Sequence, residues 1–187
     1  MIDEAEDVFT RLPQQHNIVS WNTMLSAYVE QGQGARALQL YRQMHEEGVK
    51  TDVLSFTIAL RACTLLVITA LEIGEGLHSD ARKKCFDSDI FLGNALIHMY
   101  GNYGKLDEAQ TLFDCIKAKE FLSWNVMITV YAQQGHGKKA IGVYEKMLQD
   151  NVKPNEVTFV SLFSACSHAG LINEGYYYFV SMSEVHN

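Results

Sequence analysis

The residue types that most often carry catalysis or hold a metal are scattered along this 187-residue chain. His45 and Glu47 fit the first half of the zinc signature of nucleobase deaminases, H-x-E, but no C-x-x-C pair follows them. Cys63 and Cys166 each follow an alanine, and they read as small buried helix residues. The sequence also lacks a nucleophile elbow, a phosphate-binding glycine loop and a carboxylate constellation. It therefore predicts no catalytic residue, no metal site, no cofactor and no enzyme activity of its own.

A different set of polar residues recurs and suggests hydrogen bonding to a ligand. The string Ser-Trp-Asn occurs at 20–22 and again at 123–125, so that Asn22 and Asn125 each follow a tryptophan. Asparagine is a poor residue for a helix interior, which leaves two interpretations, a helix N-cap or a side chain directed at a ligand. The tryptophans recur with Met and Tyr at helical spacing, which indicates core packing.

Internal repetition explains the recurrence. Residues 20–64 and 123–167, compared at an offset of 103, share 16 identities in 45 positions, where chance would give about three. In both copies a Gly-x-Gly turn separates two amphipathic segments, which predicts helices at roughly 19–31 and 35–47 in the first copy. Two-helix units of this kind cannot bury their apolar faces alone, so we expect them to stack as a solenoid.

The chain divides into successive blocks of this kind. We predict complete blocks at 18–52, 53–89, 90–120 and 121–155, with a partial block at 1–17 and a truncated one at 156–187. Asn94 is the fifth residue of its block, as Asn22 and Asn125 are of theirs. This shared place favours a directed side chain over a helix cap.

These blocks resemble the pentatricopeptide repeats of plant organellar proteins, in the subclass that alternates standard, long and short repeats. The standard motif is matched by IVSWNTMLSAYVEQGQGARALQLYRQMHEEGVKTD and FLSWNVMITVYAQQGHGKKAIGVYEKMLQDNVKPN, and the short one by IFLGNALIHMYGNYGKLDEAQTLFDCIKAKE. The resemblance implies an all-α, right-handed superhelical solenoid of antiparallel helix pairs, similar to tetratricopeptide folds. In this interpretation 1–17 is the second helix of a short repeat, 53–89 and 156–187 are long repeats, and the chain is a fragment of a longer array.

The resemblance also implies a function. Family members bind single-stranded RNA, one nucleotide per repeat, and support RNA processing such as C-to-U editing in mitochondria or chloroplasts. We therefore expect single-stranded RNA as the partner, together with editing-complex proteins, and neither a membrane nor a small-molecule substrate. The acidic start of the chain resembles neither a transit peptide nor a signal peptide, so the organellar location rests on the resemblance alone.

In the family, the fifth and last residues of a repeat together read one base, and the second residue packs against the base faces. Carried over position by position, the reading pairs are Asn22 with Asp52, Thr57 with Asp89, Asn94 with Glu120, and Asn125 with Asn155. The packing positions are Val19, Leu54, Phe91 and Leu122.

The family's pairing pattern assigns bases to these pairs unevenly. It implies uracil for Asn22 with Asp52, and a pyrimidine, preferentially cytosine, for Asn125 with Asn155. The Thr57 pair suggests guanine, although long repeats follow the pattern poorly. Glu120 departs from the usual Asp or Asn, so the base of its repeat stays open.

The competing interpretation is a peptide-binding module of the tetratricopeptide kind. Such modules repeat with a constant period of about 34 residues, whereas the blocks here differ in length. The expected first helices carry almost no charge, with one charged residue in 19–31, one in 54–66 and none in 122–134. Uncharged helices disfavour capture of acidic peptides, and the net charge of −7 argues against binding that depends mainly on phosphates.

Overall fold

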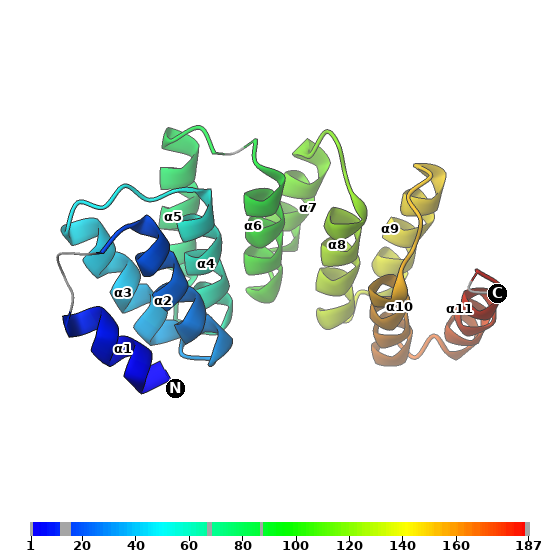
Figure 1. Ribbon diagram of the computed structural model, residues 1–187. Helices are drawn as coiled ribbons and strands as arrows, with labels where there is room; N and C mark the ends of the chain where they lie inside the picture. Colours follow the sequence, from blue (N-terminus) through cyan, green and yellow to red (C-terminus); the bar gives the residue numbers. More distant parts are fainter. Residues whose placement is uncertain (1, 12–15, 67–68, 87, 186–187) are drawn as a thin grey trace. The chain divides into compact units, whose positions relative to one another are not determined.

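The computed structural model describes residues 2–11, 16–66, 69–86 and 88–185, and all regular secondary structure within these ranges is helical (Figure 1). In chain order the helices are α1 (Ile2–Arg11), α2 (Ile18–Glu30), α3 (Gly34–Glu46), α4 (Val53–Thr64), α5 (Leu71–Lys83), α6 (Ile90–Asn102), α7 (Leu106–Cys115), α8 (Phe121–Gln133), α9 (Gly137–Gln149), α10 (Glu156–His168) and α11 (Ile172–Val185). Parts of the predicted terminal blocks, residues 1, 12–15 and 186–187, lie outside the described residues, as do 67–68 and 87.

The chain forms two compact units, residues 1–95 and 96–187, divided within α6. In the first unit α2 contacts α1, α3 and α4, and α4 also contacts α3 and α5. In the second unit α8 contacts α7, α9 and α10, and α10 also contacts α9 and α11. A first helix therefore packs both on its own second helix and on helices of adjacent pairs, which is how two-helix repeats bury their apolar faces.

A glycine in the left-handed conformation ends the first helix of a pair. Gly32 has φ of 71° and Gly135 has φ of 75°, values that favour glycine because it has no Cβ. The residue after each glycine donates its backbone N–H across the turn, from Gln33 to the Tyr28 carbonyl and from His136 to the Tyr131 carbonyl, both at 2.8 Å. Helices predicted at roughly 19–31 and 35–47 lie at Ile18–Glu30 and Gly34–Glu46, one residue earlier at each end.

Aromatic residues fill the space between neighbouring helix pairs. Trp21 and Trp124 are buried, which confirms their predicted place in the core. The Trp124 ring meets Phe113 of α7 edge-on at 5.1 Å between centroids, and Trp21 meets Phe9 of α1 in the same way at 4.9 Å. The core therefore fixes the face that each first helix turns inward.

The two cysteines that were predicted to be small core residues, Cys63 and Cys166, are buried. Burial raises the pKa of the Cys63 thiol to about 12 and also raises that of Cys166, so both stay protonated at neutral pH. Within the described part of the chain, no helix combines the length and apolar character that crossing a membrane requires.

Candidate nucleic-acid interface

The last residue of a predicted block begins the first helix of the next one. Asp52 is the N-cap of α4, and its Oδ1 accepts from the Ser55 backbone N–H at 2.8 Å. Asn155 is the N-cap of α10, and its Oδ1 accepts from the Thr158 N–H at 3.1 Å. In both places the Ser or Thr hydroxyl accepts the backbone N–H of the cap residue, which completes a capping box. Asn17 begins α2 in the same way.

The fifth residue of the preceding block joins this cap. Asn22 of α2 donates its Nδ2 to Asp52 Oδ1 at 3.2 Å, and its Oδ1 lies 2.7 Å from the Ser55 hydroxyl. The Ser55 hydroxyl is also 2.8 Å from Asp52 Oδ1, so the three side chains form a closed ring. Within the described part of the chain, the second N–H of Asn22 and Oδ2 of Asp52 take no part in a hydrogen bond.

The second unit repeats this ring. Asn125 of α8 donates its Nδ2 to Asn155 Oδ1 at 3.0 Å, and the Thr158 hydroxyl donates to Asn125 Oδ1 at 2.6 Å. The Thr158 hydroxyl lies 3.0 Å from Asn155 Oδ1. Here one N–H of Asn125 and both N–H groups of Asn155 have no hydrogen-bond partner among the residues described. The arrangement brings the predicted members of each of these two pairs into direct contact.

Exposed apolar side chains flank the first ring. An open groove of about 420 Å³ is lined by Val19, Asn22, Asp52 and Leu54, together with other residues of α2. Val19 is 67% exposed and Leu54 is 54% exposed, although both lie on helices whose other apolar residues are mostly buried. The groove thus places a hydrogen-bonding pair between two apolar side chains, an arrangement suited to a flat aromatic ring with a polar edge.

The other predicted packing positions share this exposure. Phe91 at the start of α6 and Leu122 at the start of α8 are both exposed. Val157, the second residue of the final block, is exposed in the same way, although the sequence analysis did not include it. All these side chains lie at the second residue of a predicted block.

The pair Thr57 and Asp89 is arranged differently. The Thr57 hydroxyl donates to the Val53 carbonyl of its own helix at 2.9 Å. Asp89 Oδ1 accepts from the backbone N–H of Leu92 at 2.9 Å. The third residue of the following block is Leu92, which offers no hydroxyl to close a ring.

Asn94 lies in the first compact unit and Glu120 in the second. Glu120 occupies the N-cap position of α8, but its side chain makes no capping hydrogen bond. The hydroxyl of Ser123 is buried and has no hydrogen-bond partner among the described residues. Both polar atoms of the Asn94 carboxamide are likewise buried and unpartnered within the described part of the chain.

The N-cap environment keeps Asp52 ionised. Burial alone would raise the pKa of Asp52, but hydrogen bonds from the Ser55 N–H, the Ser55 hydroxyl and the Asn22 amide outweigh it and hold that pKa below its ordinary value. At neutral pH Asp52 therefore presents a carboxylate oxygen, a hydrogen-bond acceptor only.

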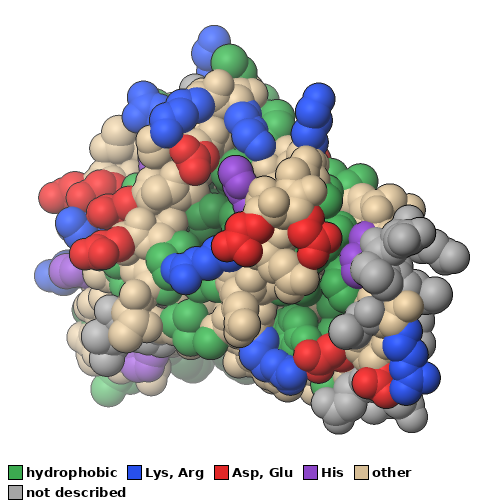
Figure 2. Space-filling view, turned by 90° about the vertical axis from the view of Figure 1, so that its left-hand side faces the viewer, with side chains coloured by type: hydrophobic (Ala, Val, Ile, Leu, Met, Phe, Trp, Pro, Cys, Tyr) green, Lys and Arg blue, Asp and Glu red, His purple; other side chains and the backbone are tan. Residues whose placement is uncertain are grey.

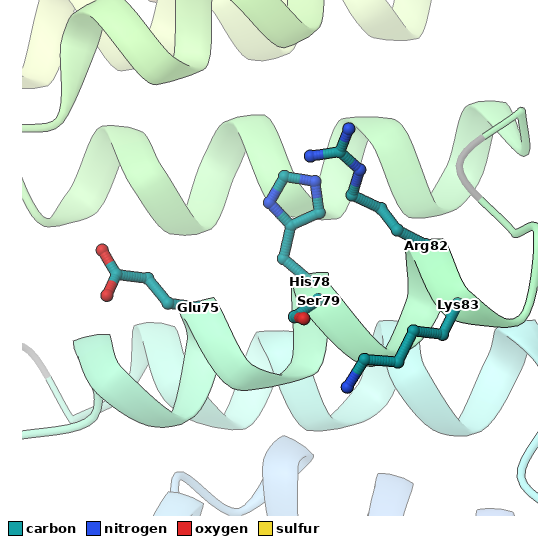
Figure 3. A pocket seen from close by; sticks show the side chains of 5 residues that line it. All are labelled: Glu75, His78, Ser79, Arg82 and Lys83. Atoms are coloured by element: carbon teal, nitrogen blue, oxygen red, sulfur yellow. The ribbon is translucent and has the colours of Figure 1, made fainter.

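Charged side chains of both signs lie on the surface of the chain (Figure 2). On the face shown in Figure 2, Lys and Arg side chains are interspersed with Asp and Glu. A second hollow, of about 390 Å³, lies along α5 (Figure 3) and is lined by Glu75, His78, Ser79, Arg82 and Lys83. His78 and Arg82 point to one side of the helix, whereas Lys83 points elsewhere and pairs with Asp80 at 2.9 Å. This hollow therefore mixes both signs of charge, with Arg82 and Lys83 beside Glu75. Among the described residues no cluster of His, Cys, Asp and Glu could hold a metal ion.

Two features of the site were missed in the sequence analysis. The last residues were predicted only as base readers, although Asp52 and Asn155 are also helix caps. The hydroxyls of Ser55 and Thr158 were not predicted as part of the site. The available signal was the capping pattern, an Asp or Asn followed by Ser or Thr three residues later, which recurs at three block boundaries, at Asn17, Asp52 and Asn155. The helix-cap interpretation of Asn22 and Asn125 is wrong, because each lies at the fifth residue of its helix.

The repeated helix pairs and their shared caps define a helical-repeat protein, and comparisons with known proteins identify its family. The PPR repeat family profile matches residues 16–64 and 120–168, and the related PPR repeat profile matches 94–121 and 157–185. The chain belongs to the PPR repeat family.

Its relatives and the solved structures agree with this assignment. In Arabidopsis thaliana the chain is 38% identical over 185 residues to a putative pentatricopeptide repeat-containing protein, At3g23330, and 38% identical over 187 residues to the pentatricopeptide repeat-containing protein CRR2, chloroplastic. These matches cover 99% of this chain but 26% and 28% of the relatives, so the chain spans about a quarter of their length.

The crystal structure of PPR10 from maize matches 99% of this chain and 27% of PPR10, with a TM-score of 0.73 and 21% identity. PPR10 in complex with an 18-nt psaJ RNA element matches 92% of this chain and 26% of PPR10, with a TM-score of 0.75 and 19% identity. The predicted fold class, an all-α solenoid of antiparallel helix pairs, is confirmed.

Proposed function

We propose that the chain binds single-stranded RNA and that each of its repeats contacts one base. The observation that carries this proposal is the groove beside α2, where Asn22 and Asp52 leave hydrogen-bonding atoms unused between the exposed side chains of Val19 and Leu54. An unpaired base offers two apolar faces and one polar edge, so it matches this groove in both respects. PPR10, which shares the fold, forms a complex with RNA, and this supports the same ligand class here.

The atoms that are not used within each ring determine which hydrogen-bond donors and acceptors it can offer to a base. At the first ring, Asn22 offers a donor and the Asp52 carboxylate an acceptor. Uracil complements this face, because its carbonyl oxygens accept and its N3–H donates. At the second ring, Asn125 and Asn155 offer donors alone, and the N3 and O2 atoms of cytosine accept. This polarity supports uracil at the first pair and cytosine at the second.

The names of the relatives support an organellar role. Their names include chloroplastic and mitochondrial proteins, so we place the parent protein in an organelle, where it acts on RNA in processing such as C-to-U editing alongside editing-complex proteins. In this proposal the chain itself selects the RNA and performs no catalysis.

A binding comparison tests the ligand class. We expect the chain to bind a short single-stranded RNA more tightly than the same RNA in a duplex, because pairing hides the base edges. The affinity should fall only shallowly with salt concentration, since the first helices offer few cations to phosphates. Equal binding to duplex RNA, or tighter binding to an acidic peptide, would instead support the peptide-binding interpretation.

A further inference from the structure

We propose that Ser55 and Thr158 are positioning residues that set base preference. Each hydroxyl holds the carboxamide oxygen of the preceding repeat's asparagine, so that the asparagine presents an N–H to the base. This inference rests on the proposed RNA-binding function, and it assigns a role to residues that do not themselves face the base.

The orientation of both asparagine side chains is set by a backbone N–H, a group that can only donate. The backbone N–H of Thr158 donates to Asn155 Oδ1, so this oxygen must point toward the start of α10. The same oxygen lies 3.0 Å from Asn125 Nδ2, which requires the Asn125 amide nitrogen to face it. Asn125 Oδ1 is thereby turned to the Thr158 hydroxyl at 2.6 Å, and the remaining N–H of Asn125 is left for a ligand.

The hydroxyl is needed because the asparagine is buried. Asn125 is only 4% exposed, so water has little access to replace a missing donor at Oδ1. Without the Thr158 hydroxyl, the oriented state would hold a buried carbonyl oxygen with no partner, which is a costly arrangement. Loss of this hydroxyl therefore reduces the advantage of the native orientation over other rotamers, although the Asn125 contact with Asn155 Oδ1 remains.

Ser55 closes the ring around Asn22 in the same way. The Asp52 carboxylate can only accept, so a reversed Asn22 amide would set its oxygen against Asp52 Oδ1. The Ser55 hydroxyl lies 2.7 Å from Asn22 Oδ1 and is the hydrogen-bond donor for this oxygen. Serine in the first ring and threonine in the second therefore occupy the equivalent position and make the equivalent hydrogen bond.

The other two reading pairs show which parts a ring needs. Where the third residue is Leu92, Asp89 still caps the helix, but the Thr57 hydroxyl turns back to the Val53 carbonyl. Where Ser123 is present but Glu120 makes no cap, the serine hydroxyl has no hydrogen-bond partner among the described residues. The ring thus occurs where the N-cap residue is Asp or Asn and the third residue of the same helix carries a hydroxyl.

The test uses the full chain with three variants and two readouts. Thr158→Val removes the hydroxyl and keeps the side-chain shape, whereas Thr158→Ser keeps the hydroxyl. Ser123→Ala is the matched control, because it removes a hydroxyl at the same helix position that makes no hydrogen bond to the described residues. The RNA probes are short adenine oligonucleotides with uracil or cytosine at two positions three nucleotides apart, one for each ring.

The expected result is confined to one base. Thr158→Val should lower discrimination at the nucleotide that faces Asn125 and Asn155 by about tenfold, the factor that corresponds to roughly 1.4 kcal/mol, within the range of one base contact. The preference at the Asn22 nucleotide should stay, and Thr158→Ser and Ser123→Ala should keep both preferences. In the RNA-free protein, the side-chain amide protons of Asn125 should exchange faster with solvent in Thr158→Val than in Thr158→Ser.

The outcomes separate this inference from the function on which it rests. If Thr158→Val keeps its helicity, its base preferences and slow Asn125 amide exchange, Thr158 does not position Asn125. If the unaltered chain binds none of the RNAs, the proposed function fails and Thr158 has no role in base preference. In that case the amide exchange of Asn125 still shows whether the hydroxyl orients it.

Discussion

Glu120 begins α8 at the position where Asp52 and Asn155 cap their helices, but its side chain is one methylene longer than theirs and makes no cap. Replacing Glu120 by Asp keeps the charge and gives the N-cap side chain the length with which Asp52 caps α4. We expect this variant to gain about 1 kcal/mol of unfolding free energy, the usual contribution of an N-cap. Urea unfolding monitored by circular dichroism measures the gain.

Glu120→Gln is the matched control for that experiment, because glutamine has the length of glutamate and should leave the stability nearly unchanged. Equal unfolding midpoints for Glu120→Asp and the unaltered chain would show that the length of Glu120 is not what prevents the cap.

Asp52 makes the stability of the chain depend on pH in a defined direction. Its folded-state pKa lies below the ordinary value, so the unfolded chain binds the proton more readily. The stabilisation from the Asp52 carboxylate is therefore present above the unfolded pKa of about 4. It is lost as the pH falls through the lower pKa of the folded state.

Asp52→Asn isolates this effect, because asparagine caps a helix without titrating. The difference in melting temperature between the unaltered chain and the variant should move in favour of the variant as the pH falls below about 4. Melting curves recorded from neutral to acidic pH measure it. A difference that stays constant across this range would mean that the ring does not lower the pKa of Asp52.

At the scale of helices, close contact at the start of α9 links one pair to the next. A Cβ added to Gly137 would lie 2.7 Å from the Ala165 carbonyl oxygen and 2.6 Å from Ala169 Cβ. Gly137→Ala should therefore separate α9 from α10 and cost about 1–3 kcal/mol, as overpacking does. Chemical unfolding provides the measurement.

Gly142, in the middle of the same helix, is the control. Nothing lies within 4 Å of the position that its Cβ would occupy, so Gly142→Ala should stabilise α9 by about 0.5–1 kcal/mol through helix propensity alone. If both variants shift stability in the same direction, contact at Gly137 does not hold the helices together.

Local patterns in the sequence predict the ends of the helices and the faces that they bury. Glycine turns such as the one at Gly32 placed helix ends to within one residue, and the apolar spacing around Trp21 and Trp124 predicted the buried faces. The rings could not be predicted in this way, since each joins residues about 30 positions apart. A long-range contact such as Asn22 with Asp52 was expected only from the family resemblance, and the third member, Ser55, was missed.

At the scale of the whole molecule, composition sets the kind of binding that we expect. The net charge is −7, and acidic and basic side chains are interspersed on the face shown in Figure 2. Such a surface attracts phosphates weakly, so RNA recognition would depend on base edges and base faces. Base preference is therefore the property that distinguishes sequence-specific recognition by this chain from nonspecific RNA binding.

Exchange of the two cap residues tests that property most directly. The measurement is the affinity for adenine oligonucleotides with uracil or cytosine at two positions three nucleotides apart. The unaltered chain should prefer an oligonucleotide with one uracil and one cytosine. Asp52→Asn should prefer cytosine at both positions, and Asn155→Asp should prefer uracil at both. The double variant should prefer the same two bases in the opposite order. If all four proteins keep their helicity and rank the oligonucleotides identically, the cap residues do not read the bases.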